Sequence, residues 1–161
     1  MTVVIRIALA ILAVNELVVG AWNQIDPASF YRYFPTVDLT PPFSEHYARD
    51  FGGATLGIAA LLVVAAIRPR GGFVLPAAIA YSVFSIPHFV FHLEHLAGAS
   101  LPQAVFLVAG NAAVAMLGVL VITLTVVRKT RDRRRQHPAL GQPPGRRDRQ
   151  PAGSAVRRTV P

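Results

Sequence analysis

Three histidines, at positions 88, 92 and 95, lie in an apolar stretch that reads YSVFSIPHFVFHLEH from Tyr81 to His95. Their i, i+4, i+7 spacing puts the three imidazole rings on one stripe of a helix. Two histidines four residues apart can chelate one cation, and ionisable side chains at membrane depth usually face a bundle interior or a water-filled cavity. The stripe therefore predicts a site for a metal ion or a haem, or a proton path, inside a membrane.

Two carboxylates and a fourth histidine, in or beside other apolar stretches, extend this candidate set. Neutral imidazole with carboxylate suits zinc or iron, and three protein ligands with an open position make a bound water acidic enough for hydrolysis. A transmembrane haem needs axial histidines on facing helices, for which His46 opposite His88 or His92 is the pair to test. The chain has no cysteine, which excludes thiolate ligands and thiol catalysis. The predicted ligands, for zinc, iron or haem, are His46, Asp50, His88, His92, His95 and Glu16.

The same residues also fit functions without a metal. Histidine and carboxylate chains mark proton paths in membranes. Neutral histidines beside Tyr81 and Ser85 would also line a site for a lipid or a small ligand. A third interpretation is a polar network that only joins helices, with hydrogen bonds worth about 0.6 kcal/mol each. The sequence leaves open whether the protein is an enzyme, an electron carrier, a transporter or a non-catalytic accessory subunit of a membrane complex.

The composition is that of a membrane protein. Of the 161 residues, 53% are hydrophobic and 15% are charged, compared with roughly 25% charged in soluble domains. Apolar stretches at 3–22, 51–67, 73–91 and 104–127 are long enough to cross a bilayer, which takes roughly 20 residues. No period-2 alternation suggests a barrel. We therefore predict an all-α integral membrane four-helix bundle, formed by residues 1–127.

The first stretch has a competing interpretation as a secretory signal peptide. Arg6 would be its basic start, and Val19-Gly20-Ala21 is similar to a small-residue cleavage pattern. Asn15 and Glu16 interrupt the apolar run, however, and favour a retained first helix.

Basic residues predict the orientation of the bundle. Arg6, Arg68, Arg70 and the start of the C-terminal segment lie on one predicted side, whereas 23–50 carries two basic residues against four acidic ones. Short cytoplasmic loops are enriched in Lys and Arg. We expect a multi-pass protein of a bacterial-type plasma membrane with both termini in the cytoplasm. The aromatic and proline-rich loop within 23–50 is expected to lie along the outer leaflet as an interfacial cap.

The C-terminal segment differs from the rest of the chain. Eleven of the 16 Lys and Arg residues lie between Arg128 and Arg158, among many Pro, Gly and Gln residues. Such a segment cannot bury enough apolar surface to offset its ordering entropy, so we predict a disordered basic tail over 128–161. Its first arginines are candidates for binding anionic lipid headgroups, and no aromatic interleaving points to specific nucleic-acid binding.

Helical phase predicts which faces meet. In the second stretch, polar and small residues recur at heptad-like spacing, which places His46 and Asp50 on a face expected to be buried against another helix. With alternating helix directions, Glu16, the histidine stripe and Asn111 come to one level in the outer half of the membrane. The expected seam of the second stretch is His46, Asp50, Gly53, Gly57 and Ala60.

In size and four-span layout the chain resembles the small bacterial DoxX-like membrane proteins. The resemblance covers the four apolar stretches in their length and order, and it carries over no site residue and no activity. A homo-oligomer or a partner within a membrane complex is compatible with such a bundle.

Overall fold

The computed structural model describes residues 1–39 and 42–136. Four of its helices are long and apolar enough to cross a membrane, which confirms the predicted all-α four-span bundle. These four are α1, α3, α4 and α5, and the segment between α1 and α3 adds a short helix α2 and a 3₁₀ turn η1. The elements are α1 (Thr2–Ile25), α2 (Pro27–Tyr33), η1 (Val37–Leu39), α3 (Glu45–Ile67), α4 (Val74–Glu94) and α5 (Leu101–Gln136).

Local signals set the helix boundaries around the first loop. Asp26 ends α1 and caps α2, because its carboxylate accepts a hydrogen bond from the Ser29 amide at 3.1 Å, and Pro27 occupies the first turn. Ser44 caps α3 in the same way. Arg49 then ties α3 to the end of α1 by donating to the Gln24 carbonyl.

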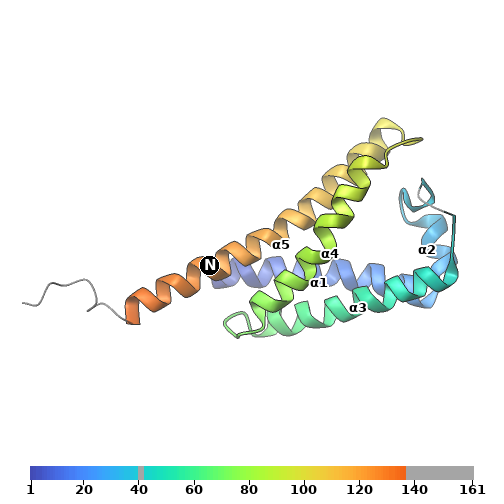
Figure 1. Cartoon of the computed structure of the whole chain (residues 1–161). Coiled ribbons are helices and arrows are strands. Elements are labelled where there is room, and N and C mark those ends of the chain that lie inside the picture. Colours follow the sequence, from blue (N-terminus) through green and yellow to red (C-terminus); the bar gives the residue numbers. More distant parts are fainter. Residues whose placement is uncertain (40–41, 137–161) are drawn as a thin grey trace, which may run out of the picture.

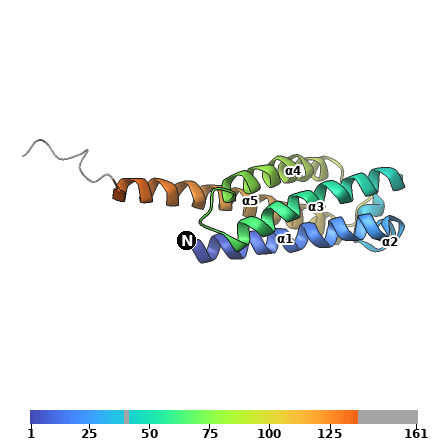
Figure 2. The same ribbon diagram turned by 90° about the horizontal axis from the view of Figure 1, so that it is seen from below.

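The spanning helices form two antiparallel pairs. α1 packs mainly against α3, and α4 mainly against α5, with fewer contacts between the pairs. Figure 1 shows that the pairs lie close together at one end and diverge towards the other. We call the end with the start of α1 and the α3–α4 loop the basic end, and the end with α2 and the α4–α5 loop the cap end. Figure 2 shows α5 continuing beyond the other helices at the basic end.

The apolar core lies in the half of the bundle near the basic end. All four spanning helices contribute to it, and small residues such as Ala8 and Ala78 let the backbones approach each other. The buried core residues are Ile5, Ala8, Leu9, Leu12, Ala13, Leu62, Ala65, Val74, Ala77, Ala78, Tyr81 and Val121.

The contact between α1 and α3 is closest at a pair of glycines. A Cβ atom on Gly52 would lie 2.9 Å from the Gly20 carbonyl oxygen, and one on Gly20 would lie 2.6 Å from Thr55 Oγ1. These helices therefore pack through Gly20 and Gly52.

The predicted seam of α3 is wrong. His46 and Asp50 are exposed, with side chains 89% and 68% accessible, and a Cβ atom on Gly57 would meet nothing within 4 Å. The helix is rotated relative to the prediction because the close approach of α1 requires Gly52, one position away from the predicted Gly53. The buried face consists of Gly52, Thr55, Ala59, Leu62 and Ala65.

The predicted start of the disordered tail is also wrong for its first residues. α5 continues through Gln136, so 128–136 is helical, and Arg128 is 9% exposed. Arginine is a good helix former, and extending an existing helix needs no new nucleus. The remainder of the predicted tail, 137–161, lies outside the described residues.

Candidate functional site

A cavity of about 990 Å³ lies between the two helix pairs, towards the cap end. Every helix contributes to its wall, and the divergence of the pairs in Figure 1 accounts for its position. Three of the predicted site residues line it: Glu16 from α1, and His88 and His92 from α4. Its other polar lining residues include Asn15, Asn23, Tyr81, Ser85 and Asn111.

Glu16 is the carboxylate of this cavity. Its side chain is 2% exposed, and its Oε1 accepts a hydrogen bond of 3.2 Å from Asn15 Nδ2. Its Oε2 is buried without a hydrogen-bond partner among the described residues. A buried carboxylate oxygen without a partner is costly, and because this oxygen is enclosed by its neighbours, a ligand would bind it after a small movement of a side chain.

His88 and His92 lie next to each other on the α4 wall. Their ring centroids are 4.6 Å apart in an edge-to-face arrangement, and His88 stacks on Phe84 at 5.3 Å. His92 is 8% exposed, and its Nδ1 is buried without a hydrogen-bond partner in the described part of the chain. Tyr81 and Ser85 continue the same stripe and are buried, so the predicted face of α4 is confirmed from Tyr81 to His92, whereas His95 at its end is exposed.

The other three predicted ligands do not line the cavity. His95 is exposed beyond the end of α4, where its ring stacks on Phe91 and its Nδ1 lies 2.7 Å from the Phe91 carbonyl oxygen. His46 Nε2 and Asp50 Oδ2 form an exposed pair at 3.3 Å in the first turns of α3. Over residues 1–39 and 42–136, no three or more His, Cys, Asp or Glu side chains form a group that could hold a metal ion.

Aromatic residues of the first loop line the cap end of the cavity. Trp22 contacts Phe30 edge to face at 5.6 Å, and Phe30 stacks on Phe34 at 4.7 Å. Phe30 and Phe34 line the cavity, as do Tyr31 and other residues of this loop. The loop predicted as an interfacial cap therefore also forms a wall of the site.

Two features of the cavity were missed from the sequence. Asn23 is 3% exposed and lines the cavity seven residues after Glu16, on the same face of α1. The i, i+7 spacing of two polar residues in an apolar helix was a usable signal for it. The apolar part of the wall, which includes Phe51, Phe84 and Phe106, carries no such signal because an apolar residue in a spanning helix can face lipid equally well.

The arrangement brings one carboxylate and two imidazoles to an otherwise largely apolar space. Among the described residues that line it there is no lysine or arginine. The site can therefore accept and donate hydrogen bonds and attract positive charge, while it offers no cationic partner to an anion. No family model matches the chain, and neither the curated proteins nor the solved structures give a match, so the site alone indicates the function.

Proposed function

We propose that this membrane protein binds a small amphipathic molecule, neutral or cationic, in the cavity between its two helix pairs. The observation that carries the proposal is that buried polar atoms without a hydrogen-bond partner among the described residues, Glu16 Oε2 and His92 Nδ1 among them, belong to residues that line one cavity. Buried polar groups are normally hydrogen-bonded, and each exception calls for an explanation. A ligand that supplies the missing partners is that explanation.

The size and lining of the cavity support an amphipathic ligand. Its volume of about 990 Å³ lies at the upper end of the range of small-molecule sites, roughly 300–1,000 Å³. Such sites combine mostly apolar walls with a few polar groups that fix orientation. Here Phe51, Phe84 and Phe106 would contact the apolar part of the ligand, while Glu16 and His92 would bind its polar end.

The charge of the lining favours a neutral or cationic ligand over an anionic one. Glu16 is the carboxylate of the site, and the lining residues that the structure describes include no Lys or Arg. An anion would be desolvated beside a carboxyl group without a counter-charge, whereas an amine would pair with it.

The single tryptophan provides a direct test. Trp22 contacts Phe30 and Phe34, which line the cavity, so its fluorescence should respond when the cavity fills. The protein in neutral nanodiscs is titrated with three probes of equal chain length: decylamine, decanol and decanoate. We expect saturable changes with the amine and the alcohol, and about a tenfold weaker response to the acid.

Glu16→Gln should abolish the preference for decylamine over decanoate while retaining binding of decanol. Glu94→Gln is the matched control, because Glu94 is exposed at the end of α4 and does not line the cavity. Equal responses to all three probes, or the same change in both variants, would contradict the proposal.

A metal or haem site is the alternative, and it rests on the contact between His88 and His92. Two adjacent imidazoles supply half of a tetrahedral zinc site, but among the described residues no third His, Asp or Glu lies close enough to join them, so the other donors would come from outside this set. Stoichiometric zinc or iron in the purified protein, or a haem absorption band, lost in a His88→Ala/His92→Ala variant, would favour this alternative over the amphipathic ligand.

We also infer a bacterial-type plasma membrane as the location, with both termini in the cytoplasm. The distribution of Arg residues supports the orientation, because Arg6, Arg68 and Arg70 lie at the basic end with the charged end of α5. A DoxX-like relationship, homo-oligomerisation and binding of anionic headgroups by the tail stay predictions.

A further inference from the structure

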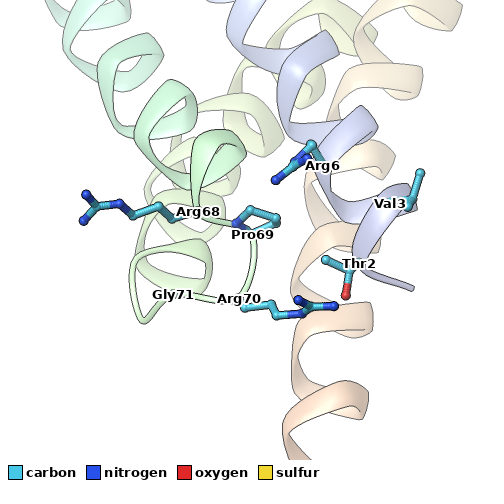
Figure 3. Close-up of a pocket in the computed structure, with 7 residues that line it drawn as sticks. All are labelled: Thr2, Val3, Arg6, Arg68, Pro69, Arg70 and Gly71. Carbon is cyan, nitrogen blue, oxygen red and sulfur yellow. The ribbon is translucent and has the colours of Figure 1, made fainter.

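A second, smaller cavity lies at the basic end, away from the site described above. It has a volume of about 410 Å³ and is formed by the start of α1 and the loop between α3 and α4. Figure 3 shows Arg70 reaching towards Thr2, Arg6 lying against the loop, and Arg68 extending away on the other side. The lining residues are Thr2, Val3, Arg6, Arg68, Pro69, Arg70 and Gly71.

The positive charge of this cavity is not neutralised by acidic side chains. Its described lining residues include three arginines and no carboxylate. The ion pairs between described residues, His46–Asp50 and Arg49–Glu45, both lie at the start of α3, near the cap end. An anion in this cavity would therefore meet the Arg70 guanidinium, with the positive charge of Arg6 beside it and no carboxylate among the described lining residues.

Arg6 has a structural role beside this charge. Its Nε donates to the Ala66 carbonyl at 3.2 Å, and one of its terminal nitrogens lies 3.5 Å from the Ile67 carbonyl. These are the last carbonyls of α3, where a cation is favoured by the helix dipole. Arg6 thus fixes the α3–α4 loop against α1, whereas no hydrogen bond or ion pair with another described residue occupies the Arg70 guanidinium.

A fourth arginine adds positive potential at the same end. Val121 of α5 belongs to the same buried core as Ile5 and Val74, and Arg128 follows two turns later, nearer the basic end, although it does not line the cavity. Arg128 is 9% exposed, and its Nη1 is buried without a hydrogen-bond partner among the residues that the structure describes. Desolvated positive charge of this kind attracts an anion more strongly than a solvated side chain does.

We propose that the cavity formed by Arg6, Arg70 and the α3–α4 loop binds the phosphate headgroup of an anionic phospholipid. A loop between two spanning helices lies at headgroup level, and basic pockets between such helices are a known way of binding phosphate-bearing lipids. Arginine suits this ligand because its planar fork binds phosphate oxygens in pairs. The position of the cavity at headgroup level favours a bilayer lipid as the ligand. Free phosphate in solution carries the same charged group and is the competing ligand.

The test measures binding of phosphatidylglycerol, relative to phosphatidylcholine, by native mass spectrometry of the full chain released from neutral detergent. One basic residue near an anionic surface changes the binding constant about fivefold, so Arg70→Gln should weaken phosphatidylglycerol binding about fivefold. Arg70→Lys keeps the charge and should retain most of the binding. Arg133→Gln is the matched control, since Arg133 is exposed on α5, does not line the cavity and gives the same change in net charge.

Equal weakening by Arg70→Gln and Arg133→Gln would overturn the proposal, because it would indicate general surface charge. Unchanged binding in both variants would overturn it as well. Displacement of the lipid by millimolar inorganic phosphate would show that the cavity prefers free phosphate, and would overturn the lipid as its ligand. Retained helical circular dichroism and a single size-exclusion peak establish that each variant is folded, and Arg70→Gln leaves the Arg6 contacts with α3 in place.

Discussion

Near the basic end, the four spanning helices meet in a core of small and branched apolar side chains. Near the cap end, the same helices surround a cavity of about 990 Å³, whose lining residues include Glu16 and His92, each with a buried polar atom that has no hydrogen-bond partner among the described residues. Lipid is as apolar as a protein core, so helices in a membrane associate through close packing and not through the hydrophobic effect. The half near the basic end therefore holds the bundle together, and the half near the cap end leaves space for a ligand.

Replacing a buried leucine by alanine in each half should give the largest difference in stability between the two halves. Leu9 is completely buried in the core, whereas Leu107 is 5% exposed and lines the cavity. Leu9→Ala leaves a new void and should lower the free energy of unfolding by about 3 kcal/mol, while Leu107→Ala only widens existing space and should cost about 1 kcal/mol. Reversible unfolding in mixed micelles measures both. Equal losses would mean that the two halves are packed alike.

A substitution within the cavity should have a smaller effect of opposite sign. His92→Leu removes a buried nitrogen that has no hydrogen-bond partner in the described part of the chain, so the ligand-free protein should gain about 1 kcal/mol of stability. His95→Leu, three residues further along, is the control and should change little because His95 is exposed. A loss of stability in the His92 variant would instead identify a polar network that joins the helices.

The exposed pair of α3 should give the smallest effect. His46→Ala should change the free energy of unfolding by less than about 0.5 kcal/mol, because exposed ion pairs contribute little. Reversible unfolding in mixed micelles measures this change, and Asp50→Asn, which removes the other partner of the pair, is measured in the same way. A loss well above this value would show that another molecule covers this face of α3, which size-exclusion chromatography with light scattering would then detect.

Much of the fold follows from the sequence because a bilayer imposes strict length and polarity limits on each spanning helix. Residues in the middle of a span obey those limits, and Tyr81, Ser85 and His92 were placed correctly on the buried face of α4. Glu16 also lies in the cavity, as its depth in the membrane predicted.

The errors arose where those limits weaken. His46 and Asp50 lie in the first turns of α3, where a polar side chain can reach headgroups or water and no longer has to face the bundle. The spacing of Gly53 and Gly57 made them plausible contact residues. The position of closest approach depends on where Gly20 lies in α1, however, and the sequence of α3 alone contains no information about that. The end of α5 was misjudged because a composition that cannot form a core can still extend a helix through Gln136.

The Gly20–Gly52 contact bears on how related chains can be found. A Cβ atom at either position would lie 3.0 Å or less from the backbone of the facing helix, so neither glycine can be replaced without moving α1 against α3. Gly57 and Gly110 have open space around them, so other residues can replace them. In related chains we expect the two constrained glycines to be more conserved than most of the surrounding sequence. The same holds for Asp26-Pro27, which lies between them and ends α1. A search pattern built on these positions should therefore reach relatives that overall identity does not.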